Sequence, residues 1–360
     1  MTDFLMLGAG LLLLVGGGEL LVRVASRLAL TFGVSPLVVG LTVVAFGTSS
    51  PEVAVSVQSA LSGQDDIAVG NVIGSNIFNG LFILGVSALI VPLIVNQQLV
   101  RQEVPIMIGT SLLLPALVWD GGLSRIDGLI LIGCLAAYTA FLIIQSRRLN
   151  AAHPGVAPSA SDAGSSWHSK LAAQVALIVA ALALLVLGAN WLVAAAVAIA
   201  KSLGVSEMII GLTIVAAGTS LPEVATSIVA AIRGQRDIAV GNVVGSNIFN
   251  ILGVLGLSAA AAPSGLLVAP AMMAFDVPVM IAVAIASLPL FFTGNLIARW
   301  EGALFVGLYV AYTAYLVLAA QQHDALSTYG FVLGIVVLPL CALTIVTIAW
   351  REWRARHRSM

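Results

Sequence analysis

Long apolar segments, separated by short polar ones, run through almost the whole chain. A helix needs roughly 20 apolar residues to cross a bilayer core about 30 Å thick. On that length the pattern predicts eleven spanning segments, at residues 4–22, 36–61, 66–91, 104–119, 125–145, 171–195, 207–232, 237–262, 277–293, 300–319 and 326–350. We therefore expect an all-α polytopic membrane protein.

Composition agrees with a membrane protein. Charged residues make up 9% of the 360 residues, whereas soluble domains average about 25%. Hydrophobic residues reach 60% and the mean hydropathy is +1.09, so a soluble fold would expose a large apolar surface. The net charge of −1 gives no basic face for nucleic acid. The expected partners are inorganic cations and membrane lipid, and no protein partner is implied.

The basic residues predict the orientation of the chain. With the N-terminus outside, thirteen of the fifteen Lys and Arg residues fall on the inner side, and only Arg125 and Lys201 lie outside. This distribution satisfies the positive-inside rule. We expect a multi-pass protein of the inner, cytoplasmic membrane with its C-terminus in the cytoplasm.

The chain contains an internal repeat. Residues 40–79 and 211–250 align without gaps at an offset of 171 and are identical at 29 of 40 positions. Weaker matches on both sides extend the repeated unit to five helices. Because five is odd, the second copy must enter the membrane from the opposite side, which gives two inverted-topology repeats with an ion site expected near the midplane.

The repeat divides the chain into four parts. These are a first five-helix repeat (1–146), a cytoplasmic linker (147–170), a second five-helix repeat (171–320), and one extra C-terminal transmembrane helix with a basic cytoplasmic tail (321–360). The linker is predicted from its Pro and Ser content and its low complexity.

The most strongly repeated block falls in the middle of a span. It reads GTSSPE at residues 47–52 and GTSLPE at residues 218–223. Pro51 and Pro222 have no N–H to donate, so each should break its helix and free a backbone carbonyl. Irregular backbone at membrane depth is tolerated only where it is buried or lines a polar cavity.

Each copy of this block ends in a glutamate at the bilayer centre. A carboxylate there costs at least about 2.5–3.5 kcal/mol. No Lys, Arg or His lies at the same depth, so a bound cation, or protonation when it leaves, must neutralise the pair. Thr and Ser four and three residues earlier can share a helix face with each glutamate. The two sets are Thr48, Ser49 and Glu52, and Thr219, Ser220 and Glu223.

A second repeated motif, GNVIGSNIFN at 70–79 and GNVVGSNIFN at 241–250, supplies more oxygen atoms. Its GxxxG spacing favours close helix packing, and a Ser and an Asn one turn apart are candidate ligands. These are Ser75 with Asn79 and Ser246 with Asn250. For Asn71, Asn76, Asn242 and Asn247 a hydrogen bond across helices is an equal alternative. A site made only of oxygen atoms suits hard cations such as Ca²⁺, Na⁺, Mg²⁺ or Mn²⁺.

Three other acidic residues are expected to be structural. Glu103 and Asp276 precede a proline at matching helix starts, where they are predicted to cap the helix. Glu19, aligned with Asn190, is expected to make a structural hydrogen bond near the cytoplasmic end of the first segment.

The two motif pairs resemble the α1 and α2 repeats of the sodium/calcium exchanger family, within the cation/calcium antiporter superfamily. The resemblance covers residues 4–145 and 171–319. It implies ten core helices, a central cluster of cation sites, and alternating access by sliding of the first and sixth helices.

The resemblance also implies roles for single residues. By it, Glu52 and Glu223 are shared Ca²⁺ and Na⁺ carboxylates, and Asn79 and Asn250 are the polar pair in the middle. It further implies Ca²⁺ carbonyl ligands at Thr48 and Thr219, Na⁺ hydroxyl ligands at Ser49, Ser75, Ser220 and Ser246, and Na⁺ carbonyl ligands at Ala45 and Ala216. Many relatives have aspartate at position 79 or 250, so this site holds less negative charge.

The expected function is secondary active exchange of Ca²⁺ for Na⁺ by alternating access, most simply Ca²⁺ efflux. No resident cofactor is expected, because Ca²⁺ and Na⁺ bind as transported ions. H⁺ in place of Na⁺, or another divalent cation in place of Ca²⁺, is the alternative. An enzyme is not expected, since the sequence has no Ser–His pair, paired catalytic Asp motif or HExxH motif. A passive channel is a third option.

Overall fold

The computed structural model describes residues 2–152, 171–204, 210, 213–214, 216–292, 295–323 and 325–339. The elements of the first half, with π- and 3₁₀-helical turns written η, are α1 (Thr2–Phe32), α2 (Pro36–Val39), η1 (Gly40–Val44), α3 (Ala45–Thr48), α4 (Ser50–Leu61), α5 (Asp65–Phe78), η2 (Asn79–Ile83), α6 (Leu84–Ile90), β1 (Leu93–Ile94), η3 (Leu99–Glu103), α7 (Val104–Leu117), η4 (Val118–Asp120), β2 (Gly122–Leu123) and α8 (Arg125–Ala152).

The second half repeats this order. Its elements are α9 (Leu171–Ser202), α11 (Ala216–Gly218), α12 (Leu221–Ile232), α13 (Arg236–Phe249), η8 (Asn250–Leu255), α14 (Gly256–Ala261), β3 (Leu266–Leu267), η9 (Met272–Asp276), α15 (Val277–Phe292), β4 (Leu296–Ile297) and α16 (Arg299–Ala320), followed by α17 (Leu326–Val332) and η10 (Leu333–Val337).

The membrane-spanning helices agree with the expected segments. In the described residues, eight helices are long and apolar enough to span a membrane, and a bent pair, Pro36–Thr48 with Ser50–Leu61, makes a ninth. The remaining two expected segments, 207–232 and 326–350, lie partly outside the described residues. Most of the linker and all residues after 339 also lie outside the described residues.

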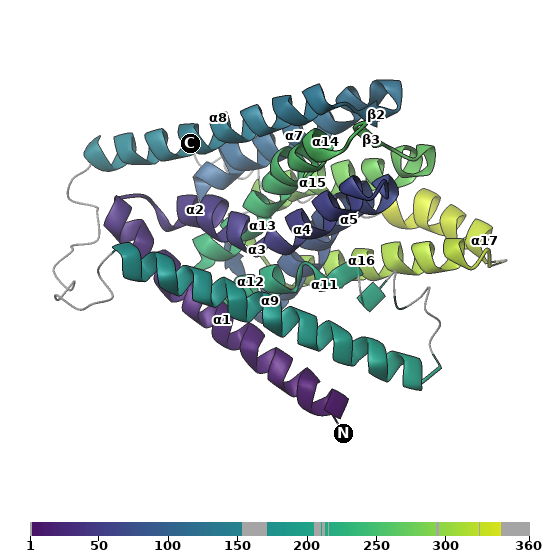
Figure 1. Cartoon of the computed structure of the whole chain (residues 1–360), viewed down its shortest axis with the longest axis horizontal. Coiled ribbons are helices and arrows are strands. Elements are labelled where there is room, and N and C mark those ends of the chain that lie inside the picture. Colours follow the sequence, from purple (N-terminus) through teal and green to yellow (C-terminus); the bar gives the residue numbers. More distant parts are fainter. Residues whose placement is uncertain are drawn as a thin grey trace, which may run out of the picture.

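The first helix of each half is longer than expected. Helix α1 has 31 residues and α9 has 32, where about 20 suffice to span a bilayer. Such length is accommodated by tilt relative to the bilayer normal. Figure 1 shows the two helices crossing the lower edge of the molecule side by side.

Helices α1 and α9 run antiparallel, as an inverted repeat requires. An added Cβ at Gly10 would meet Gly188 O, whereas one at Gly17 would meet Ala181 O, so the contacts move back along α9 as they move forward along α1. Further on, Gln174 Nε2 donates to Thr31 Oγ1 at 3.0 Å. The first helices of the two halves therefore have opposite directions.

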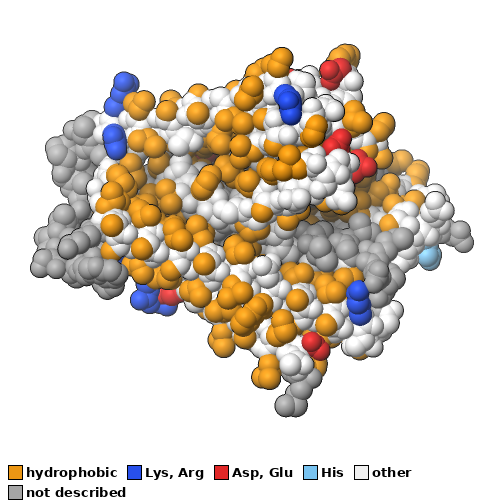
Figure 2. Space-filling view, in the orientation of Figure 1, with side chains coloured by type: hydrophobic (Ala, Val, Ile, Leu, Met, Phe, Trp, Pro, Cys, Tyr) orange, Lys and Arg blue, Asp and Glu red, His pale blue; other side chains and the backbone are white. Residues whose placement is uncertain are grey.

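The rest of the two halves forms one apolar core around α13. Residues Ile238–Phe249 of α13 are all buried, and the helix lies in the middle of the molecule (Figure 1). Two short strand pairs join the halves reciprocally, since β1 pairs with β4 and β2 pairs with β3. On the outside, hydrophobic side chains cover most of the face seen in Figure 2, and the few charged side chains lie towards its rim.

The expectation that Glu103 and Asp276 cap helices is wrong. The spans begin earlier, with π-helical turns at Leu99 and Met272, so both carboxylates lie inside a helical segment where free N–H groups are lacking. Instead, Tyr138 Oη donates to Glu103 Oε2 and Tyr312 Oη donates to Asp276 Oδ1, each at 2.7 Å. These two bonds hold η3 to α8 and η9 to α16.

Candidate functional site: a buried acidic pair at broken helices

Two broken helices build the site. Helix α3 ends at Thr48 and α4 begins at Ser50, with a bend of 47° between Pro36–Thr48 and Ser50–Leu61. Pro51 stands in the first turn of α4, where its missing N–H costs nothing. In the second half α11 ends at Gly218 and α12 begins at Leu221, again with a proline in the first turn. The predicted helix breaks are confirmed.

The two glutamates are buried, and each is bonded to a serine of the opposite half. Glu52 is 0% exposed and Glu223 is 1% exposed. Ser220 Oγ donates to Glu52 Oε1, and Ser49 Oγ donates to Glu223 Oε1, both at 2.8 Å. Each carboxylate therefore accepts its serine bond from the opposite half.

This cross-pairing differs from the grouping expected from sequence. Spacing along one helix places Thr48 and Ser49 on the same face as Glu52 only if the helix is continuous. The bend at Ser49, which has φ −81° and ψ 11°, turns its hydroxyl away from that face. The two broken helices face each other, so Ser49 reaches Glu223 instead.

Asn71 and Asn242, for which the sequence allows ligation or a hydrogen bond across helices, support the broken helices. Asn242 Nδ2 donates to Ser227 Oγ at 3.0 Å and to the backbone carbonyl of Glu223 at 3.5 Å. Its Oδ1 accepts from Thr48 Oγ1 at 3.1 Å, which joins the halves again. Asn71 repeats this pattern with Ser56, the Glu52 carbonyl and Thr219.

The second motif lies beside the glutamates. The hydroxyl oxygens of Ser75 and Ser220 lie 3.1 Å apart, within hydrogen-bond distance, so Ser75 joins the network of the first motif. Asn79 and Asn250 are 1% and 0% exposed, and each begins a π-helical turn inside its span. Single π-turns of this kind are frequent at functional sites because they re-aim side chains. Ser246 is fully buried on α13.

Asn76 and Asn247 contact each other where the two halves meet. The amide of Asn76 donates to the backbone carbonyl of Asn247 at 3.3 Å, and Asn247 returns the bond at 3.4 Å. One bond breaks the symmetry, because Asn250 Nδ2 donates to Asn76 Oδ1 at 3.0 Å. For these two asparagines, hydrogen bonding across helices is the outcome.

The close packing expected from the glycine pairs is clear in the second copy. An added Cβ at Gly245 would lie 2.7 Å from the backbone of Leu41, and one at Gly241 would lie 3.1 Å from Leu37 O. In the first copy Gly70 has only the tip of Met272 nearby, at 3.2 Å, among the described residues.

Several buried oxygen atoms of the site have no hydrogen-bond partner among the described residues. They are Glu52 Oε2, Glu223 Oε2, Asn79 Oδ1, Asn250 Oδ1, Asn247 Oδ1 and Ser246 Oγ. Leaving a buried polar atom without a partner costs about 1–3 kcal/mol. A set of unpartnered carboxylate, amide and hydroxyl oxygens is the environment that hard cations prefer.

The other predicted ligands lie on the broken helices or in the turn beside them. Thr48 is buried, and its hydroxyl lies 3.1 Å from two acceptors, Val44 O and Asn242 Oδ1. Ala45 is buried, and its carbonyl accepts from the N–H of Ser49 at 3.0 Å. Ala216 begins α11, and Thr219 lies in the turn that follows it.

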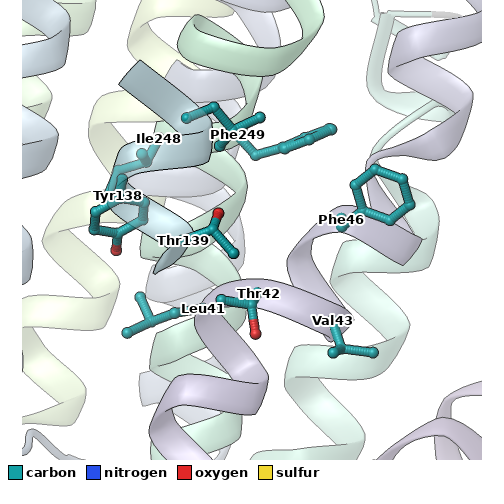
Figure 3. Close-up of a pocket in the computed structure, with 10 residues that line it drawn as sticks. Leu41, Thr42, Val43, Phe46, Tyr138, Thr139, Ile248 and Phe249 are labelled. Atoms are coloured by element: carbon teal, nitrogen blue, oxygen red, sulfur yellow. The ribbon is translucent and has the colours of Figure 1, made fainter. Parts of the chain in front are cut away.

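Two cavities adjoin the site. One of about 450 Å³ is lined by Asp66, Asn71, Ser75, Thr219 and Asp276 among others, so it reaches polar groups of the site. The other, of about 280 Å³, is mainly apolar and lies between α3, α8 and α13 (Figure 3).

In the apolar cavity, Phe46 and Phe249 meet edge to face with ring centroids 5.2 Å apart. Figure 3 shows these two rings together at one side of the cavity, opposite Tyr138. With such a lining, this second cavity does not suit a bare cation.

The fold and the site together define a membrane transporter built from two repeats. The family model described as sodium/calcium exchanger protein matches residues 2–144 and 173–318. The chain belongs to this family, which is one of transporters and not of enzymes.

Similar proteins are known in bacteria and archaea. The inner membrane protein YrbG of Escherichia coli is 41% identical over 256 residues, which cover 71% of this chain and 78% of YrbG. The sodium/calcium exchanger MaX1 of Methanosarcina acetivorans is 34% identical over 342 residues, covering 86% and 97% of the two chains. The structure of the sodium–calcium exchanger NCX_Mj superposes with a TM-score of 0.73 at 30% identity, covering 88% of this chain and 99% of that one.

Proposed function

We propose that this protein exchanges Ca²⁺ for Na⁺ across the inner membrane by alternating access and works mainly as a Ca²⁺ efflux system. The observation that carries the proposal is the pair Glu52 and Glu223, buried, held across the two halves, and each with one unpartnered oxygen. Two such carboxylates need cations in a membrane interior. The names of MaX1 and NCX_Mj support Na⁺ and Ca²⁺ as those cations.

The proposed ligand set is the one expected from sequence. The carboxylates of Glu52 and Glu223 bind both ions, helped by Asn79 and Asn250. The remaining ligands are Thr48, Thr219, Ser49, Ser220, Ser75, Ser246, Ala45 and Ala216. We place the N-terminus outside and the basic tail in the cytoplasm, with lipid around the helices.

Exchange of H⁺ for Ca²⁺ is the second candidate. The observation that favours it is neutral asparagine at both positions 79 and 250, because two glutamates alone can be neutralised by two protons as well as by two Na⁺. Transport of another divalent cation would use the same carboxylates.

Flux into vesicles tests the proposal. The protein is reconstituted and Ca²⁺ uptake is measured with an outward Na⁺ gradient, with a pH gradient, and with neither. We expect uptake to follow the Na⁺ gradient. Uptake that ignores Na⁺ and follows the pH gradient would overturn Na⁺ coupling, and Ca²⁺ leak without any gradient would indicate a channel.

Substitutions at the glutamates test the site. Glu52→Gln and Glu223→Gln keep the side-chain shape but remove the charge, so each is expected to abolish exchange while leaving the folded protein intact. Glu103→Gln is the matched control, because Glu103 is also a buried glutamate yet bonds to Tyr138 away from the pair. Exchange retained in both site variants would contradict the assignment.

A further inference from the structure

We propose that the ion pair between Glu19 and Arg233 is a latch that stabilises the conformation of this structure against the opposite conformation of the transport cycle. The latch rests on the proposed function, because alternating access requires two such conformations, but it lies outside the cation site. Both side chains reach solvent, so the salt concentration around them sets the strength of the latch.

The latch joins α1 to α12. Arg233 Nε donates to Glu19 Oε2 at 2.7 Å, and Glu19 Oε1 accepts a second bond from Arg23 on its own helix. Arg233 directly follows the last residue of α12, whose first turn carries Glu223. The part of the chain that the structure describes has no other ion pair between α1 and α12. The latch therefore attaches α1 to one of the two broken helices, at the end away from the glutamate.

Apart from the latch, α1 lies against α12 through small and apolar residues. An added Cβ at Gly18 would lie 3.2 Å from Ala225 O, so the two backbones approach closely, as small residues permit in membrane helices. Within the described residues, no other side-chain hydrogen bond connects these two helices. The bond between Glu19 and Arg233 is therefore the directional contact that fixes α1 relative to α12.

The other half of the molecule cannot form an equivalent latch. By the repeat, Glu19 corresponds to Asn190 and Arg233 corresponds to Ser62, so α9 and α4 have no charged pair at these positions. Helix α9 also makes at most slight contact with α4, whereas α1 packs along α12. Inverted repeats exchange their arrangements when one repeat moves against the other, so in the opposite conformation α1 leaves α12 and α9 approaches α4. The latch therefore stabilises only one of the two conformations.

Two equivalent side chains show which end of the molecule is closed. Thr226 on α12 is 0% exposed and lies beside α1, because an added Cβ at Gly18 would be 3.5 Å from Thr226 N. Its equivalent on α4, Val55, is 37% exposed and lines the cavity of about 450 Å³ that reaches Asn71 and Ser75. Since the repeats are inverted, these two positions lie towards opposite ends of the bundle. The closed end is the one that carries the latch.

The latch is weak enough to open in every transport cycle. Exposed ion pairs of this kind change an equilibrium by about 1.4- to 5-fold. A change of this size shifts the balance between two conformations without trapping either of them. Salt screens exposed charges over about 10 Å at 0.1 M and over about 3 Å at 1 M. High ionic strength at this end of the molecule therefore releases the latch.

Thiol reactivity measures the balance between the two conformations in the full-length protein. Cys134 and Cys341 are replaced by serine, and Thr226→Cys or Val55→Cys is introduced as the single thiol. The purified protein in detergent then reacts with a charged maleimide. We expect Glu19→Gln to raise the reaction rate of Thr226→Cys by about 1.4- to 5-fold and not to raise that of Val55→Cys. An unchanged rate at Thr226→Cys, or an equal rise at both positions, would overturn the latch.

Arg23→Gln is the matched control. Arg23 also bonds to Glu19 but moves with α1, so its loss is expected to leave the rate at Thr226→Cys unchanged. Arg233→Gln is expected to match Glu19→Gln, and the double variant should show no further rise. An effect of Arg23→Gln equal to that of Arg233→Gln would overturn the pairing.

Salt tests the latch without any substitution at it, even if the Glu19→Gln protein does not fold. Choline chloride raised to about 1 M is expected to increase the rate at Thr226→Cys when Glu19 is present, and not in the Glu19→Gln protein. A rate that ignores salt with Glu19 present would overturn the latch.

Ca²⁺/Na⁺ exchange in vesicles is measured separately, so the two failures are distinguishable. Exchange that persists while Glu19→Gln leaves the rate at Thr226→Cys unchanged would remove the latch alone. A Glu19→Gln effect on Thr226→Cys in a protein that does not exchange Ca²⁺ for Na⁺ would support the latch and overturn the proposed ions. A Thr226→Cys thiol that never reacts, with or without Ca²⁺ and Na⁺, would overturn both the latch and alternating access.

Discussion

The contact between α1 and α9 gives a prediction whose sign follows from the structure. A Cβ added at Gly10 would lie 2.8 Å from both Gly188 O and Leu192 N. These are backbone atoms of another helix and cannot rotate away, so the helices must separate. The equivalent change at Gly188 brings its Cβ to 2.8 Å from Gly10 O. Gly16 on the same helix has no described atom within 4 Å of its added Cβ.

Two contributions to the free energy of unfolding have opposite signs in a glycine-to-alanine substitution. Replacing glycine by alanine inside a helix gains up to about 1 kcal/mol from reduced backbone freedom. Overpacking a close contact costs about 1–3 kcal/mol. Gly16→Ala should therefore raise the free energy of unfolding by up to about 1 kcal/mol, whereas Gly10→Ala should lower it by up to about 2 kcal/mol.

Thermal unfolding of the purified protein in detergent measures the difference. We expect the Gly16→Ala protein to melt at or above the wild-type temperature and the Gly10→Ala protein to melt below it. Because Gly10 and Gly188 report the same contact, the double variant should lose less than the sum of the two single changes. Equal melting temperatures for Gly10→Ala and Gly16→Ala would refute the close approach.

Three further predictions concern contacts elsewhere. Asn242→Ala removes the acceptor that the Thr48 hydroxyl has in the opposite half and the amide donor to Ser227 Oγ, and should cost about 1–3 kcal/mol in unfolding free energy and weaken Ca²⁺ binding measured by titration calorimetry. Glu19 and Arg233 form an ion pair at 2.7 Å with a 54% exposed arginine, so a double-mutant cycle should give a coupling of only about 0.2–1 kcal/mol that falls with salt. Tyr138→Phe removes the donor to a buried carboxylate, and should lower the free energy of unfolding by about 1–3 kcal/mol without changing the dependence of exchange on Na⁺.

The sequence could reveal the repeat, the helix breaks and the two central glutamates for a simple reason. A charge or a proline in the middle of an apolar span is costly, so its presence marks a special position without any knowledge of the fold. Glu52 and Glu223 are such positions, and the structure buries both just after the helix breaks.

The sequence does not predict which side chains form hydrogen bonds between the two halves. Spacing along the chain reports which side chains share a helix face, but not which helix faces another. The bonds from Ser49 to Glu223 and from Ser220 to Glu52 depend on how the halves dock. The bond from Tyr138 to Glu103 lies within the first half, but it too depends on which helix faces another, because the two residues lie 35 positions apart. The π-turn at Asn79 left no signal either, because one extra residue in a turn barely changes an apolar pattern.

The reciprocal bonds have a consequence for how site and motion are connected. Each glutamate is held by a serine of the opposite half, so any shift of one broken helix past the other acts on both carboxylates at once. Two separate sites, each complete within its own repeat, would not have this property. The bond from Asn250 to Asn76 has no counterpart from Asn79 among the described residues, so the two halves are not equivalent at their centre. A cation bound between the glutamates would contact both halves. Its binding or release would therefore change the contacts that hold the two halves together.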